Sequence, residues 1–197
     1  LQELTHLNCN NNLISTIRFK NNGALHSLSC KNNQLNQLDL KDNVLLTFLE
    51  VSNNQLQQID LSTNIFLNYF SCYKNQISQL NLQNNLLLDH LNCSDNFLTS
   101  LDVRQNTQLS YLSFQKNQLI SINLNNNDWL ESLICGDNNL LQLSINNITP
   151  LKYLSCYSNQ LSTIDLSSNT LLEQLIINHN LLNNLDLSSN IMLKRLN

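Results

Sequence analysis

The chain has 197 residues and a formal net charge of −4, and only 12% of its residues are charged. This mild acidic balance disfavours a nucleic-acid interface and a polybasic membrane anchor, because both need an excess of basic side chains. Thirty-eight asparagines stand against two glycines and one proline. Tight turns are therefore expected to rely on Asn, which tolerates left-handed backbone and can bond its own turn.

Neither end of the sequence carries a recognisable targeting segment. No apolar run is long enough to cross a membrane, and the first residues lack the basic start and apolar stretch of a signal peptide. The sequence begins at Leu1 without an initiator Met and stops at Asn197, inside a further repeat. We therefore expect a fragment of a longer chain, with capping units, an export signal or a catalytic domain outside it.

A repeat of 21 residues fills the chain from Leu4 onward. Nine complete units follow one another without insertion or deletion, and a partial tenth unit opens at Leu193. Their shared pattern is L-x-x-L-x-C-x-x-N-x-L-x-x-L-D-L-x-x-N-x-x. Because each unit can bury its apolar residues only against its neighbours, residues 1–197 are predicted to form a single elongated solenoid domain. The complete units begin at Leu4, Leu25, Leu46, Leu67, Leu88, Leu109, Leu130, Leu151 and Leu172.

The two halves of the unit both indicate extended backbone. Apolar and polar residues alternate in the first half, which predicts a short strand with one buried face. The second half, as at Ile164 and Leu166, again spaces apolar residues two apart. No window has the spacing of three to four that an amphipathic helix needs. We expect a parallel sheet on one side, short extended segments on the other, and little or no helix.

All six cysteines occupy the sixth position of the unit, which the alternation points inward. They share this column with Val51, Phe114 and Ile177, so an apolar side chain is sufficient there. Strands about 4.8 Å apart satisfy the Cα distance of a disulfide, but Cβ atoms that project side by side suit its dihedral angle poorly. Reduced, buried, inert thiols are favoured over bridges, and zinc is disfavoured because column neighbours cannot converge tetrahedrally. The cysteines are Cys9, Cys30, Cys72, Cys93, Cys135 and Cys156.

Two asparagine columns run along the chain. The ninth position is Asn in every complete unit, and an amide there can satisfy backbone groups of its own turn and of the adjacent one. This column is predicted to be a buried structural ladder. The nineteenth position is Asn in all complete units except one, where Ile148 precedes the single proline, Pro150. We expect the turn at 146–150 to be locally irregular.

The segment L-x-x-L-x-C-x-x-N-x-L resembles the highly conserved part of leucine-rich repeats, and the whole unit is similar to the 21-residue bacterial class called IRREKO. The resemblance covers essentially the entire chain. It implies a right-handed solenoid with a parallel sheet on its concave side, found mostly in bacterial proteins that are exported, displayed on the cell surface or delivered to a host. The family carries no catalytic motif, so neither enzyme activity nor a cofactor is expected. The departures from its pattern are Arg18, Asn81, Asn123 and Ser144 in place of Asp, and Ile148 in place of Asn.

In that arrangement the second, third, fifth, seventh and eighth residues of each unit face the concave solvent. Every tyrosine and every histidine of the chain lies at one of these positions, and the third position carries a stripe of rings in four successive units. Rigid rings are enriched in binding hot spots, although the same stripe could instead stiffen the sheet as a cross-strand ladder. The candidate binding residues are Phe48, Tyr69, Tyr73, His90, Tyr111, Tyr153 and Tyr157.

No catalytic or metal site is predicted on this surface. The histidines are too dispersed to share a metal ion, and a hydrolytic set of His90 with Ser71, Ser113 and Asp89 has no implied oxyanion donor on a flat sheet. The mixed, slightly acidic concave charges disfavour nucleic acid. We therefore predict a scaffold that binds a protein partner. A carbohydrate-binding adhesin, a purely structural spacer and an effector with a separate enzyme domain are the alternatives.

Overall fold

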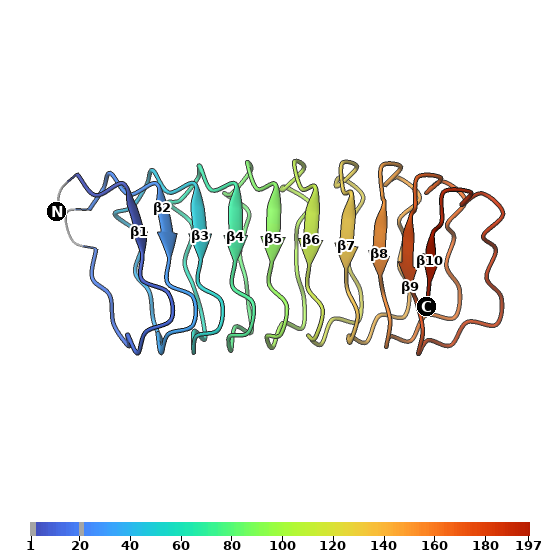
Figure 1. The fold of residues 1–197 in the computed structure, drawn as a ribbon, viewed down its shortest axis with the longest axis horizontal. Coiled ribbons are helices and arrows are strands. Elements are labelled where there is room, and N and C mark those ends of the chain that lie inside the picture. The colour runs from blue at the N-terminus through green and yellow to red at the C-terminus, as the bar shows by residue number, and fades with distance from the viewer. Residues whose placement is uncertain (1–2, 20–21) are drawn as a thin grey trace.

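The computed structural model describes residues 3–19 and 22–197, which contain ten short strands and no helix. The strands form one parallel sheet in chain order, and each residue pairs with the residue 21 positions later, as Phe48 does with Tyr69. Figure 1 shows them side by side along the long axis, with β1 and β10 at opposite ends. The strands are β1 (His6–Asn8), β2 (Ser27–Ser29), β3 (Phe48–Glu50), β4 (Tyr69–Ser71), β5 (His90–Asn92), β6 (Tyr111–Ser113), β7 (Ser132–Ile134), β8 (Tyr153–Ser155), β9 (Gln174–Ile176) and β10 (Arg195–Leu196).

The predicted fold class is confirmed: a parallel β-solenoid whose other side consists of extended segments and turns. Each unit adds one layer to a continuous apolar core. In the fifth unit Leu88, Leu91, Cys93 and Leu98 are all completely buried. None of the described segments forms a helix of the length and apolarity needed to span a bilayer.

The cysteine column lies inside this core as free thiols. Five of the six are buried, and Cys9, in the first unit, is half-buried. Burial raises the pKa of Cys30, Cys93 and Cys156 to about 12. In the part of the chain that the structure describes, no group of three or more His, Cys, Asp or Glu side chains is placed to hold a metal ion.

Thiol titration of the native protein at pH 8 is expected to find at most one reactive group, Cys9, and five further groups after denaturation. The reactive species is the thiolate, and a thiol whose pKa is raised by burial forms very little of it at that pH. A reagent that absorbs at a distinct wavelength on reaction measures both stages. Rapid reaction of two or more native thiols, or a bridge such as Cys9 to Cys30 in mass spectrometry, would contradict the expected result.

The first asparagine column forms the predicted ladder, as Asn96 illustrates. Its Nδ2 donates to the carbonyl oxygens of Cys93 (3.1 Å) and Ser94 (3.0 Å) in its own unit and of Cys72 (3.0 Å) in the previous one. Its Oδ1 accepts from the backbone N–H of Ile77 at 3.0 Å. One side chain thus joins two units, because it bonds backbone groups of both.

The second asparagine column sits between two consecutive turns. The N–H of Asn106 donates to the carbonyl of Val103, and the carbonyl of Asn106 accepts from Leu109. Its Nδ2 donates to Leu82 (3.1 Å) and Asn85 (2.8 Å) in the previous unit. Its Oδ1 is buried and has no partner among the described residues. This column is therefore less completely bonded than the first.

The expected irregularity at 146–150 is wrong. Ile148 keeps both turns, with N···O distances of 2.9 Å to Ile145 and 3.4 Å from Leu151. The neighbouring side chain supplies the missing amide: Nδ2 of Asn147 donates to the carbonyl of Leu124 at 3.1 Å. An Asn at position 148 would bind this same carbonyl, because other residues of the column bond the carbonyl 24 residues earlier, as Asn127 bonds Val103.

Left-handed backbone recurs at the eighth residue of every complete unit, with φ between 49° and 58°. Asn holds this position only in the first three units, and neither glycine has a positive φ. The expected reliance on Asn is thus only partly right. Most L-residues pay about 1–2 kcal/mol for this conformation. In the first eight units the N–H groups of the eighth and ninth residues donate to carbonyls of the next unit, which helps to hold it. The residues are Asn11, Asn32, Asn53, Lys74, Asp95, Lys116, Asp137, Ser158 and His179.

Candidate binding site on the concave sheet

Four rings at the third position of successive units stack into one column. The centroids of Phe48 and Tyr69 lie 4.4 Å apart, those of Tyr69 and His90 4.4 Å, and those of His90 and Tyr111 4.1 Å. The interplanar angles are 12°, 12° and 5°. The in-register parallel sheet causes this arrangement, because it sets the first residues of β3, β4, β5 and β6 side by side. We call these four residues the ring column.

The rings of the column are half-buried. Desolvation lowers the pKa of His90 and raises the pKa values of Tyr69 and Tyr111. All four rings are therefore uncharged at neutral pH. The inner faces cover one another, so the column offers solvent mainly ring edges and the two outer faces at its ends.

The other predicted ring residues lie outside this column. Tyr153 occupies the same position on β8, but Ser132 on β7 separates it from Tyr111. Tyr73 is half-buried at the seventh position of its unit. The structure thus brings four of the seven candidate residues into direct ring contact and leaves three apart.

Tyr157 lies across Gly136 of the preceding unit. A Cβ added to Gly136 would come within 2.3 Å of Cε1 of the tyrosine, so only glycine leaves room for this ring. The hydroxyl donates to Oδ2 of Asp137 at 2.9 Å, and Oε1 of Gln115 lies 3.4 Å from it. Burial and the Asp137 carboxylate raise the pKa of Tyr157 to about 12. The ring is held over the sheet by these contacts.

Several fifth and seventh residues are not solvent-facing, which corrects the sequence-based assignment of the surface. Ser71 and Ser113 are only 3% and 2% exposed. Their hydroxyls pair with those of Ser52 (2.8 Å) and Ser94 (2.7 Å) in the adjacent units. Neither serine hydroxyl is therefore presented to solvent beside His90.

Ion pairs cross from unit to unit at the second position. Nζ of Lys152 lies 2.8 Å from Oε2 of Glu131, and Nζ of Lys194 lies 2.8 Å from Oε2 of Glu173. Both pairs are exposed, so each contributes little to stability. They do neutralise the charges along this border of the sheet.

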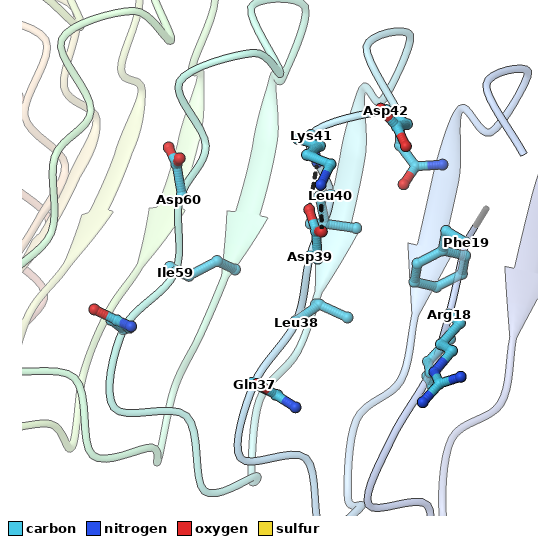
Figure 2. A pocket seen from close by; sticks show the side chains of 13 residues that line it. Arg18, Phe19, Gln37, Leu38, Asp39, Leu40, Lys41, Asp42, Ile59 and Asp60 are labelled. Carbon is cyan, nitrogen blue, oxygen red and sulfur yellow. Dashed lines mark hydrogen bonds and ion pairs between the residues drawn. The ribbon is translucent and has the colours of Figure 1, made fainter. Parts of the chain in front are cut away.

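A hollow of about 930 Å³ opens on the opposite, convex side. Figure 2 shows Asp39 paired with Lys41 (3.2 Å), while Arg18 and Asp60 project from the neighbouring units. Asp39 and Lys41 are each 68% exposed at the side chain. These groups do not converge on a common point, so the hollow has no set of ligands for a specific small molecule.

An exposed apolar ridge, missed in the sequence, runs along one border of the solenoid. It consists of the last two residues of three successive units, between 39% and 51% exposed. The signal was present as an adjacent apolar pair at the end of each of these three units, a spacing that cannot point both side chains into the core. The ridge residues are Val44, Leu45, Ile65, Phe66, Leu86 and Leu87.

Solved structures of bacterial repeat proteins resemble this chain. The functional domain of InlJ from Listeria monocytogenes, described as including a cysteine ladder, is 31% identical, with a TM-score of 0.82 over 99% of this chain and 48% of its own. YopM, a leucine-rich effector protein from Yersinia pestis, is 27% identical, with a TM-score of 0.76 over 88% of this chain and 49% of its own. A leucine-rich repeat protein of Leptospira interrogans has a TM-score of 0.91 at 22% identity over 99% of this chain and 54% of its own, which shows the fold alone.

This chain spans about half the length of each of these three proteins. No protein-family model matches it, and no match was found among curated proteins.

Proposed function

This chain is a bacterial leucine-rich repeat protein, and we propose that its concave sheet is a scaffold that binds a protein partner. The observation that carries the proposal is the ring column, Phe48, Tyr69, His90 and Tyr111, stacked at 4.1–4.4 Å on four adjacent strands. Its rings are fixed before a partner arrives, so binding them costs little side-chain entropy. Aromatic residues that are already ordered are typical of interface hot spots.

The same geometry weakens the carbohydrate alternative. A sugar ring stacks on an aromatic face, and the column exposes such faces only at Phe48 and Tyr111. The edges that it presents between those ends, from Tyr69 and His90, are better suited to the mixed polar and apolar surface of a protein. The acidic balance of the chain, with 14 acidic and 10 basic residues, is also unfavourable for nucleic acid.

We also propose that the chain comes from an exported or host-directed protein. The similarity to YopM supports this idea, since YopM is described as an effector protein. Fractionation of a culture that expresses the full-length gene tests it: export is expected to place the product at the cell surface or in the medium. Retention of all the protein in the cytoplasm would contradict it. No catalytic role is proposed for the described residues.

The binding proposal is tested by replacing Tyr69 and Tyr111 together with Ala. Each ring is expected to contribute about 2 kcal/mol of affinity as a hot spot, so each loss weakens binding about 30-fold. Partners are captured from host-cell lysate by the wild-type chain and identified, and their dissociation constants are then measured with purified components. A glycan array with the same protein tests the carbohydrate alternative directly.

Two controls separate binding from folding. The double replacement with Phe keeps the stacked rings and is expected to retain most of the affinity. The double replacement with Ala also loses stacking worth about 0.5–1.5 kcal/mol per ring pair. The thermal unfolding of the Ala variant must therefore be measured. A matched pair on the border, Phe66→Ala with Trp129→Ala, removes two exposed rings outside the sheet. Loss of binding in this border variant alone would place the interface on that border of the solenoid and overturn the proposal.

A further inference from the structure

We propose that the break in the ring column at Ser132 is a recognition site for one aromatic side chain of the partner protein. This inference rests on the proposed function and specifies what the concave sheet recognises. Ser132 lies between Tyr111 and Tyr153, its register partners on β6 and β8. Four rings therefore stand on one side of the break and one ring on the other, with a hydroxymethyl group between them.

The spacing of the break equals that of an existing ring position. Neighbouring rings in the column are separated by 4.1–4.4 Å, and Tyr111 and Tyr153 are two such steps apart in register. His90 already fills an equivalent interval between Tyr69 and Tyr111. One further planar ring above Ser132 would thus reproduce, on both of its faces, the contact that His90 makes.

The protein does not fill this interval itself. In residues 3–19 and 22–197, ring stacking runs from Phe48 to Tyr111 and no further. If the ring of Tyr153 lay over Ser132, it would stack on the ring of Tyr111, and these two rings make no such contact. Ser132 and Tyr153 are both half-buried rather than covered.

The floor of the break favours an aromatic side chain over a sugar or a nucleotide. Below Ser132 on β7 comes Ile134, a half-buried apolar residue at the position where both neighbouring strands have a buried serine. Beyond it, the ring of Tyr157 covers Gly136 and closes that end. A sugar has several hydroxyl groups to bond, and the floor offers it only the hydroxyl of Ser132. An aromatic ring needs only apolar contact.

The opposite end of the break carries no free charge. Glu131 and Lys152, which flank it at the second position, neutralise each other at 2.8 Å. The lysine at this end is thus already paired with a carboxylate, which also repels a phosphate, whereas an uncharged ring needs no charge here. The chemistry of the site therefore fits Phe, Tyr or Trp of a protein partner.

A second break at Ser27, between His6 and Phe48, serves as an internal control. It has a serine at the third position but lacks an apolar floor, because Ser29 stands where β7 has Ile134. His6 on its outer side is exposed in the first unit. The two breaks share their width and differ in their floors.

The test uses p-cresol as a stand-in for a tyrosine side chain, with NMR of the whole 197-residue chain. We expect saturable shifts of the ring signals of Tyr111 and Tyr153 in the wild type. The Ser132→Tyr variant fills the break with the chain's own ring, so these shifts should vanish or need at least ten times more p-cresol. Ser27→Tyr should leave them unchanged. Methyl β-glucoside is run in parallel as the sugar probe.

Folding of the variants is checked by thermal unfolding, since Ser132→Tyr is expected to keep or raise Tm as the stack becomes continuous. Tyr153→Ser, which removes one wall, should weaken p-cresol binding without filling the site. The inference is overturned if p-cresol gives no saturable shift, if the Ser132→Tyr variant responds like the wild type, or if the glucoside is bound more tightly.

Failure of this inference can be distinguished from failure of the proposed function. Partner capture that depends on Tyr69 and Tyr111 but is indifferent to Ser132→Tyr would refute the aromatic site alone. A p-cresol site at Tyr111 and Tyr153 with no ring-dependent partner would instead refute the protein-binding role.

Discussion

Replacing Asn96 with Ala is expected to lower the free energy of unfolding by about 1–3 kcal/mol, the cost of one buried polar group left unpaired. The change leaves the N–H of Ile77 without its acceptor. The carbonyls of Cys72, Cys93 and Ser94 each lose one donor but keep a second, from Asn75, Asn117 and Lys74 respectively. Asn96 is only 5% exposed, so water cannot replace the amide without a local opening. Urea denaturation followed by circular dichroism measures the difference.

Asn96→Asp should be at least as damaging, although it has the same shape. A carboxylate oxygen would then face three carbonyl oxygens where the amide nitrogen donates now. Lowering the pH should restore part of the stability of this variant, because a protonated carboxyl group can donate again. The sign follows from linkage: the native state of the variant favours the neutral form, so its stability falls as pH rises.

The matched control is Asn106→Ile in the second column. It removes two donated bonds and an oxygen that has no partner among the described residues, and Ile148 already occupies the equivalent place. The cost should be about 1 kcal/mol, below that of Asn96→Ala, because the carbonyls of Leu82 and Asn85 keep the N–H groups of Asn85 and Leu88 as donors. Equal costs at the two positions would mean that the first column is not the stronger ladder.

Phe114→Cys is the second large effect, with an expected loss of about 3 kcal/mol, in the range for emptying a buried aromatic site. The change makes unit six match the commonest residue of its column, so a consensus argument would call it harmless. Phe114 is completely buried, however, and a thiol leaves most of its volume empty. Denaturant unfolding compares the variant with Cys93→Val, which nearly conserves volume.

Cys93→Val should cost less than about 1.5 kcal/mol, because cores tolerate volume-conserving apolar exchanges, and Val51 already fills that position in another unit. A harmless Phe114→Cys together with a costly Cys93→Val would show that the column is held by sulfur contacts rather than by volume.

The register of the whole chain could be predicted from the sequence because a 21-residue period in a parallel sheet leaves one solution. The inward cysteines, the bonded Asn96 and the neighbourhood of Tyr69, His90 and Tyr111 all follow from that period. Whether the candidate rings bind a partner does not follow from it, and that part stays a prediction.

What the period could not predict depends on contacts between different positions of adjacent units. Ser71 alternates outward in its strand, yet the hydroxyl of Ser52 reaches across from the preceding unit and helps to cover it. Asn147 replaces the amide missing at Ile148 from a neighbouring position. The left-handed backbone at Lys116 carries no glycine signal, and its N–H donates to the carbonyl of Gly136 in the next unit, a contact that the 21-residue pattern alone does not reveal.

The order of the strands in the sheet determines where thermal unfolding of the chain begins. Each strand contacts only the strand before it and the strand after it. When the 197-residue chain is heated by itself, the layers of β1 and β10, which each have one neighbour within it, are therefore expected to fray first. The half-buried thiol of Cys9 and the exposed amide of Asn12 lie in such a layer. Phe48 to Tyr111 have layers on both sides, so the proposed recognition surface is expected to melt later than these two layers.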